Sequence, residues 1–320
     1  MSTTALQRPA LPQTGATLST VIRDAGPNAV FATEEFFFGQ LRNPHTRRAY
    51  RIAIERFLFW CQQRGVSLEA VSPMLVGLYF DEHPGSPATR QQHRAALRHY
   101  FDRLVQRHVV ILNPVATVRL ERFQVLEGKT PEIETTQARR LLASIETGTL
   151  AGLRDRALIG ILLYTAARIG AVVRLGRRDL YEAGGQWMVH FLEKNGKSRE
   201  IPLRQDLQQW LRAWLEASAP LPADSPLFLT LAGRSGELTG KPMSLSDACR
   251  MVKRRMKAAG LPVRLSAHSF RVAAITDLLD QGVPLEEVQR LAGHADPRTT
   301  RLYDRRDRRI TRNLVERIRI

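Results

Sequence analysis

Apolar side chains recur at helical spacing through the first third of the chain. One helix is predicted between residues 43 and 65. Its apolar face comprises Tyr50, Ile54, Phe57 and Cys61. A second long helix is predicted from Ser86, which suits the N-cap position, with Pro87 in the first helical turn. Its apolar stripe comprises Ala96, Tyr100, Leu104 and Val105. This region is therefore predicted to be all-helical.

The later two thirds of the chain mix helical and strand-like patterns. The apolar stretch 153–175 predicts two helices with a break near Thr165. Between residues 180 and 203, the GGQ and NGK turn signals separate short β-rich runs, which predicts a three-stranded antiparallel sheet. Everything after Leu203 is predicted to be helical. The expected fold class is mainly α with a small antiparallel β-sheet.

Composition shifts along the chain suggest how it is divided. We expect a flexible polar leader at 1–28, a helical domain at 29–117, and a linker at 118–134. A larger α+β domain would follow at 135–304, with a C-terminal helix at 305–320. The last helix carries one narrow apolar stripe at helical spacing, formed by Ile310, Leu314 and Ile318.

The excess of positive charge indicates which class of partner the protein binds. Lys and Arg number 48 against 31 Asp and Glu, so the formal net charge is +17 and the sequence pI is about 10.9. Only six of the 48 are lysines, which leaves 42 arginines spread over the whole chain. A guanidinium matches phosphate oxygens with two donors, so double-stranded DNA is the expected partner. The alternative is a solvated basic surface that only aids solubility. The candidate DNA-contacting residues of the helical domain are Arg47, Arg48, Arg51, Arg90, Arg94 and Arg98.

Other function classes find little support in the sequence. No apolar run approaches the roughly 18 residues of a membrane span, and the N-terminus lacks the pattern of a secretory signal. Cys61 and Cys249 lie far apart, and no Cys or His spacing suggests a metal site. We expect a cytoplasmic, nucleoid-associated protein without a metal or cofactor.

Several polar residues are candidates for chemistry, and each also has an ordinary explanation. Arg168 ends a buried apolar helix without a nearby acid, so it either reaches a distant carboxylate or binds an external anion. Lys194 and Lys197 lie on a predicted hairpin, where a solvated lysine is common. His268 and Arg271 share a helix face, although this spacing is weak by itself. Tyr303 follows His294 by nine residues in a polar segment, and a tyrosine is more often a half-buried packing residue.

The order of these residues resembles the tyrosine recombinase family of the lambda-integrase type. The matching residues are Arg168, Lys194, His268, Arg271, His294 and Tyr303. The flanks RDRALIGILLYTAARIG and LSAHSFRVAAITDLLDQGVPLEEVQRLAGHADPRTTRLYDR also match, over about 135–310. The helical domain resembles the family's SAM-like core-binding domain more weakly, through TRRAYRIAIERFLFWC and NPVATV. Two positions depart from the family: Ala166 stands where glycine is usual, and Ala171 where an acidic residue is usual.

The resemblance implies a site-specific DNA recombinase or integrase that cuts and rejoins strands without metal or ATP. Tyr303 would attack the scissile phosphate and form a 3′-phosphotyrosine. Arg168 and Arg271 would clamp the phosphate and His294 would hydrogen-bond to it. Lys194, with Lys197 as the alternative, would protonate the leaving 5′-oxygen, and His268 would assist proton transfer. Ala171 puts the orientation of Arg168 in question.

The resemblance also implies assembly. A homo-oligomer is expected on DNA, from dimer to tetramer, with residues 305–320 docking on a neighbouring copy. Origin in a mobile element or plasmid is expected from the altered first motif. Two alternatives remain: a type IB topoisomerase-like enzyme, and a catalytically silent DNA-binding regulator on the same fold. No motif in the sequence indicates an accessory protein or a particular target sequence.

Overall fold

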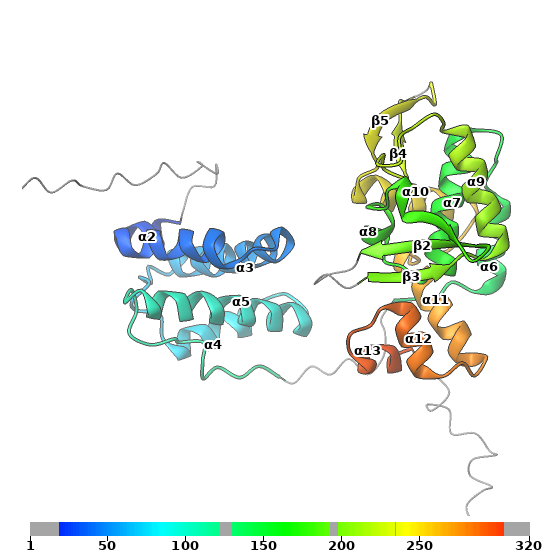
Figure 1. The fold of residues 1–320 in the computed structure, drawn as a ribbon. Helices are drawn as coiled ribbons and strands as arrows, with labels where there is room; N and C mark the ends of the chain where they lie inside the picture. Colours follow the sequence, from blue (N-terminus) through cyan, green and yellow to red (C-terminus); the bar gives the residue numbers. More distant parts are fainter. Residues whose placement is uncertain (1–18, 122–129, 193–197, 234, 304–320) are drawn as a thin grey trace, which may run out of the picture. The chain divides into compact units, whose positions relative to one another are not determined.

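The structure, a computed structural model, describes residues 19–121, 130–192, 198–233 and 235–303. The chain forms two compact units, Met1–Gln124 and Val125–Ile320, and each is described by itself (Figure 1). Within the described residues, no helix has the length and apolar character needed to cross a membrane.

Helices build the described part of the first unit. Their bounds are α1 Thr20–Asp24, α2 Pro27–Glu34, the π-helical turn η1 Glu35–Gln40, α3 Pro44–Gln63, α4 Pro73–Glu82 and α5 Pro87–Gln106. The three longest helices each begin with a side-chain cap followed by proline. Asn43, Ser72 and Ser86 accept backbone N–H groups at these N-termini, which satisfies donors that the helix itself leaves open. The helix predicted from Ser86 is confirmed.

Aromatic rings fill the core of the first unit. The ring of Phe36 lies edge-on to Tyr100 with centroids 5.5 Å apart, and Phe57 meets Phe101 at 6.0 Å. The buried hydroxyl of Tyr100 hydrogen-bonds to Thr33 Oγ1 at 2.8 Å. Each fully buried ring of this kind stabilises the fold by about 1.5–3 kcal/mol, and the pairing of the hydroxyl avoids the cost of an unsatisfied polar group.

The predicted leader 1–28 is wrong for the part that the structure describes. Thr20–Asp24 forms α1, and Val21 and Ile22 are buried in the core of the first unit. Pro27 then starts α2 after Gly26, whose φ of 92° suits only glycine. Such a short helix is stabilised by tertiary burial, and two apolar residues leave no periodic signal to find. Residues 1–18 lie outside the described residues.

Two buried histidines contact each other where α4 meets α5. His83 Nδ1 accepts the backbone N–H of Gly85 at 2.9 Å, so its proton is on Nε2, 3.1 Å from His93 Nδ1. Burial, together with the nearby His83 and Arg56, lowers the pKa of His93 to about 4. Burial and the charges of Arg56 and Arg90 also lower the pKa of His83. We call these two residues the His83–His93 pair, and it is neutral at pH 7.

The second unit combines helices with two antiparallel sheets. Its elements are α6 Thr135–Ala143, α7 Leu150–Tyr164, α8 Ile169–Val172, the 3-10 turn η2 Arg177–Asp179, β1 Leu180–Ala183, β2 Gln186–Leu192, β3 Ser198–Pro202, α9 Gln205–Ala217, β4 Leu229–Leu231, β5 Leu238–Pro242, α10 Leu245–Ala258, α11 Ala267–Asp280, α12 Leu285–Ala292 and α13 Pro297–Arg301. The predicted fold class is confirmed.

The predicted three-stranded sheet is present, in the order β1-β2-β3. Gly184 and Gly185 have positive φ at the turn between β1 and β2, which the GGQ signal predicted. The prediction that all residues after Leu203 are helical is wrong, because β4 and β5 pair as a second sheet. With only three residues, β4 is too short to show the alternation that identifies a strand.

Helix α7 runs through the core of the second unit and is apolar on most sides. It ends at Tyr164, so the break predicted near Thr165 is confirmed. At Gly160, α9 approaches so closely that a Cβ would lie 2.9 Å from both Leu207 Cδ1 and Trp210 Cε3. This close packing fixes the end of α7, from which the loop carrying Arg168 departs.

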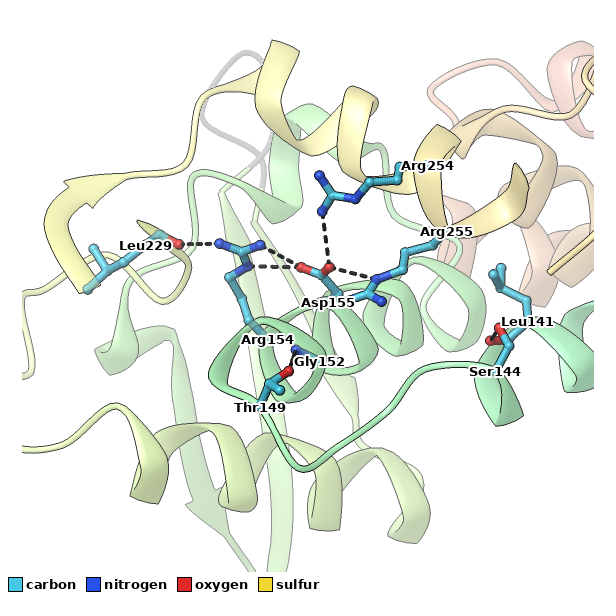
Figure 2. A network of polar contacts seen from close by, with 9 residues as sticks. All are labelled: Leu141, Ser144, Thr149, Gly152, Arg154, Asp155, Leu229, Arg254 and Arg255. Carbon is cyan, nitrogen blue, oxygen red and sulfur yellow. Dashed lines mark hydrogen bonds and ion pairs between the residues drawn. The ribbon is translucent and has the colours of Figure 1, made fainter. Parts of the chain in front are cut away.

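A buried carboxylate joins α7 to β4 and α10 (Figure 2). Asp155 is fully buried and accepts hydrogen bonds from Arg154 and from Arg255 Nε at 2.9 Å, while Arg254 NH2 lies 3.6 Å away. Arg154 NH1 donates to the carbonyl of Leu229 in β4 at 3.0 Å. We call Asp155 and its three arginines the Asp155 cluster. It holds three elements of the second unit together.

Candidate active site

The loop between α7 and α8 presents Arg168 to solvent. Thr165 caps α7 by donating to the carbonyl of Ile161 at 2.6 Å, and Ala166 then adopts a φ of 50°. This left-handed conformation favours glycine, the residue that the tyrosine recombinase resemblance led us to expect at this position. Arg168 follows as the N-cap residue of α8 and is exposed. Among the described residues, no carboxylate forms an ion pair with it, which leaves the external anion as the better explanation.

Arg271 is buried beside the same loop. It lies on α11 with 1% of its surface exposed. One terminal nitrogen donates to the carbonyl of Ala166, and NH2 donates to the carbonyl of Ala292 at 2.6 Å. The guanidinium therefore connects the loop before Arg168 with the end of α12. These two bonds end on neutral oxygens and do not cancel its charge.

His294 is placed by a left-handed glycine and by two side chains. Helix α12 stops at Gly293, whose φ is 62°, and turns the chain so that His294 lies buried. Gln289 Nε2 donates to the carbonyl of His294 at 3.0 Å, and the His294 N–H donates back to the Gln289 carbonyl at 3.2 Å. The imidazole Nδ1 lies 2.9 Å from Thr300 Oγ1. Both the backbone and the ring of His294 are fixed.

Tyr303 lies against both candidate histidines. Its ring stacks on His294 with centroids 5.9 Å apart and planes 8° apart. Its hydroxyl lies 3.4 Å from His268 Nε2, the long end of hydrogen-bond range. The ring also packs against the small cluster of buried residues that includes Ala166 and Ile275, so Tyr303 packs and also contacts the polar site.

Positive charge dominates the electrostatics of this site. Burial, as the largest cause, and the charges of Arg271, Arg168, His268 and Arg199 together lower the pKa of His294 to about 3. Partial burial of the ring, followed by Arg271 and Arg168, also lowers the pKa of His268. Both imidazoles are therefore neutral at pH 7 in the absence of a bound anion. A phosphate group placed here would meet fixed cations and neutral proton-transfer groups.

The structure brings together five of the six residues proposed for the active site: Arg168, His268, Arg271, His294 and Tyr303. We call these five the catalytic cluster, after the role proposed for them below. Lys194 and Lys197 lie outside the described residues, between the ends of β2 and β3. Their roles stay predictions. Among the described residues, no group of three or more His, Cys, Asp or Glu side chains could hold a metal ion.

Most of the candidate DNA-contacting arginines make contacts within the first unit. Arg47 donates to the Leu41 carbonyl from two nitrogens. Arg51 lies over the ring of Phe37 at 4.9 Å. Arg90 Nε donates to the Gly85 carbonyl and Arg94 Nε to the Val118 carbonyl. Arg48 and Arg98 are exposed, which makes them the freest of the six for a phosphate contact. A DNA role for all six stays a prediction.

Residues missed by sequence reasoning support the site from outside the motif. Thr300 and Gln289 hold His294, but both contacts depend on how α12 and α13 fold back, which no spacing reveals. Arg199, on β3, lies over Phe191 at 5.2 Å and contributes charge to the surroundings of His294. The sequence signal that could have pointed to Arg199 is its position just after the predicted lysine hairpin.

A cavity of about 680 Å³ lies among the helices of the second unit, and none of the five residues of the catalytic cluster lines it. Its walls come from α6, α7, α11 and α12, which include the helices that lead to Arg168 and His294. Leu142, Leu163 and Leu278 supply an apolar floor. Its charged lining residues are Glu132, Arg139, Arg204, Asp277 and Asp280.

Comparisons with known proteins agree with this arrangement. Residues 131–309 match the model of the phage integrase family, and residues 39–108 match the phage integrase N-terminal SAM-like domain. Tyrosine recombinase XerC 2 of Ralstonia nicotianae is 29% identical over 274 residues, which cover 81% of this chain and 76% of that protein. Tyrosine recombinase XerD of Pseudomonas aeruginosa is 27% identical over 263 residues, covering 81% and 86%.

Two solved structures share the fold. One is the XerH site-specific recombinase bound to palindromic difH substrate, with a TM-score of 0.67, 21% identity, and coverage of 84% of this chain and 78% of that one. The other is a lambda integrase dimer bound to a COC′ core site, with a TM-score of 0.64, 17% identity, and coverage of 88% and 96%.

Proposed function

The chain belongs to the phage integrase family and is a site-specific tyrosine recombinase, and we propose that Tyr303 is its DNA-cleaving nucleophile. The observation that carries this proposal is the position of Tyr303, whose hydroxyl faces His268 and whose ring stacks on His294 beside two arginines. A tyrosine placed only for packing has no need of these neighbours.

The proposed reaction exchanges one phosphate ester for another. The Tyr303 oxygen forms a bond to phosphorus as the bond to the 5′-oxygen breaks, leaving a 3′-phosphotyrosine. Neutral His268 accepts the phenolic proton, and Lys194 gives a proton to the leaving 5′-oxygen. A 5′-hydroxyl of another strand reverses these steps and rejoins the DNA.

The arginines and His294 would act on the transition state. Negative charge grows on the non-bridging oxygens of the phosphorane, and Arg168, Arg271 and His294 would donate to them. A preorganised donor of this kind typically contributes about 2.7–4 kcal/mol to transition-state stabilisation. The bonds of Arg271 to two carbonyls hold it in place before DNA arrives, so little reorganisation is needed.

Nicked suicide fragments taken from DNA beside this protein's own gene test the nucleophile. Wild-type protein in EDTA should form a covalent adduct on denaturing gels, and Tyr303→Phe should not. Tyr181→Phe, which alters a tyrosine on β1 of the same unit, is the matched control and should keep the adduct. An adduct that persists in Tyr303→Phe would contradict the proposal.

The same assays separate the alternative functions. DNA retarded on native gels without an adduct would favour the silent regulator and direct attention to Ala171. Relaxation of supercoiled plasmid without sequence preference would favour the topoisomerase-like enzyme. Origin in a mobile element, and association with the nucleoid in the cytoplasm, are further parts of the proposal that genomic context and cell fractionation test.

Docking of the C-terminal segment onto a neighbouring copy also forms part of the proposal. Residues 305–320 contain seven arginines and a narrow apolar stripe. The cavity among the helices of the second unit has leucines in its lining, with three acidic residues against two arginines. Attraction between the arginines of the tail and the acidic residues of the cavity would favour docking and fix the position of the tail. Dimers and tetramers on DNA would then be held by exchanged tails.

Deleting residues 306–320 should abolish strand exchange and leave DNA binding intact. Asp277→Lys, which reverses one charge of the cavity, should weaken assembly on DNA in analytical ultracentrifugation. Asp224→Lys, on an exposed loop away from the cavity, is the control. Full recombination by the truncated protein would contradict tail docking.

A further inference from the structure

The hydrogen bond between Thr300 and His294 determines more than the position of the ring. A neutral imidazole carries one proton, on either Nδ1 or Nε2, and the other nitrogen offers a lone pair. His294 is neutral at pH 7 because burial and the surrounding cations disfavour its charged form. Its use as a donor to phosphate therefore depends on which nitrogen holds the proton.

The Thr300 hydroxyl is in a position to make this choice. Thr300 is fully buried, and its hydroxyl lies 2.9 Å from His294 Nδ1. A threonine in a helix commonly donates to the carbonyl four residues earlier, but at Asp296 that carbonyl accepts the Thr299 N–H instead. Among the described residues, Nδ1 is the acceptor that the structure gives to this hydroxyl.

The energetic argument favours one arrangement. A buried hydroxyl that fails to donate costs about 1–3 kcal/mol, so the Thr300 hydroxyl donates and Nδ1 accepts. The ring proton then resides on Nε2. The opposite tautomer would leave a lone pair on Nε2, and a lone pair facing a phosphate oxygen is repulsive.

We propose that Thr300 is a positioning residue that fixes His294 in its Nε2–H tautomer, ready to donate to the scissile phosphate. The catalytic benefit rests on the proposed function. Thr300 also accepts the Tyr303 N–H at its own carbonyl, at 3.0 Å, so one residue contacts both the phosphate donor and the nucleophile. Second-layer hydrogen bonds of this kind commonly fix the tautomer of a functional histidine.

Nitrogen-15 NMR of the full-length protein tests the tautomer directly. With labelled histidine, and with the signals of His294 identified by their loss in His294→Gln, wild type should show a protonated Nε2 and an unprotonated Nδ1. Thr300→Ser keeps the hydroxyl and should keep this pattern. Thr300→Val removes it at nearly constant shape and should shift the population toward Nδ1–H. Thr299→Val, which alters the neighbouring hydroxyl, is the matched control.

Cleavage of the suicide substrate supplies the second measurement. Thr300→Val should cleave at least about tenfold more slowly than wild type, since one donor to the phosphate is lost, with unchanged affinity for DNA. Thr300→Ser and Thr299→Val should stay within about threefold of wild type. Thr300→Val with a wild-type tautomer and rate would overturn the proposal. Should wild type form no covalent adduct, the proposed function fails, while the NMR result still decides the role of Thr300.

Discussion

The second unit contains two groups of arginines that are built in opposite ways. In the Asp155 cluster, a fully buried carboxylate receives Arg154 and Arg255 and lies 3.6 Å from Arg254. In the catalytic cluster, the two bonds described for Arg271 end on backbone carbonyls, and Arg168 forms no ion pair with any carboxylate of the described residues. The first group carries its own counter-charge, whereas the charges of Arg168 and Arg271 in the second act on the two neighbouring histidines.

The pKa values of His268 and His294 reflect the positive charge of the catalytic cluster. Burial, and after it the charges of Arg271 and Arg168, lower the pKa of both His268 and His294, so the positive charge of the catalytic cluster acts on both rings. Asp155 neutralises Arg154 and Arg255 in place, whereas the exposed Arg168, which forms no ion pair within the described residues, remains available to an anion. An arginine-rich sequence alone does not distinguish these two uses.

Removal of the buried Asp155 carboxylate should have the largest effect on the free energy of unfolding. Asp155→Ala leaves three guanidiniums around an empty site, and breaking a buried ion pair in this way costs about 3–5 kcal/mol. Urea denaturation should show this loss. The control is Asp224→Ala, which removes an exposed partner of Arg178 and should cost less than about 1 kcal/mol. Equal losses in the two variants would show that the Asp155 cluster is not structural.

Loss of Arg168, whose catalytic role is proposed, should lower the cleavage rate and leave the free energy of unfolding nearly unchanged. Arg168→Ala should lower the rate of suicide-substrate cleavage by about 10²–10³-fold. Because Arg168 is exposed, the unfolding free energy should change by less than about 0.5 kcal/mol. Arg178→Ala, which removes another exposed arginine of the unit, should leave the rate unchanged. A wild-type rate in Arg168→Ala would remove this residue from the catalytic cluster.

Lowering the pH should also reduce the free energy of unfolding, through protonation of His294, and this effect should be smaller than the two above. His294 has a folded-state pKa of about 3 against its ordinary value of 6.5, so the unfolded chain binds the proton more readily. The contribution of His294 to stability is complete above pH 6.5 and is lost as pH falls toward 3, with about 2 kcal/mol lost at pH 5. Duplex DNA should reduce this loss, because a phosphate raises the pKa of the ring.

Urea unfolding between pH 7.5 and 5 measures this loss. Trp60→Phe confines the fluorescence signal to the three tryptophans of the second unit. His294→Gln should lose less stability over this range than the parent protein, and an unchanged loss would contradict the assignment. The His83–His93 pair of the first unit gives a similar acid loss, since the pKa of His93 is about 4.

The sequence predicted helices and turns correctly where contacts between residues close in the sequence stabilise them. Asn43 and Ser86 cap helices through contacts within four residues, and Gly184 and Gly185 allow the turn between β1 and β2. Helix α1 and strand β4 had no such signal. Their stability comes from burial against distant segments, and each is too short for a period to appear in the sequence.

The prediction of the active site was limited in the same way, because contacts between distant segments leave no pattern in the sequence. The order of polar residues identified the positions that the structure gathers around Tyr303, but it gave Arg168 a buried setting that the structure replaces with an exposed one. The carbonyl partners of Arg271 and the contact of Thr300 with His294 arise from chain segments brought together only by folding. Lys194 lies outside the described residues, and its role stays a prediction.

The two carbonyl bonds of Arg271 also restrict how this protein can diverge. Ala166 and Ala292 lie 126 positions apart in the sequence, yet one buried side chain spans them. An insertion or deletion of a single residue directly at Ala166, or at the end of α12 beside Ala292, would move a carbonyl by about 3–4 Å and break its buried bond to Arg271. Length changes should therefore be excluded from the two segments that carry these carbonyls, whereas segments such as the β4–β5 turn, which hold neither carbonyl, should tolerate them.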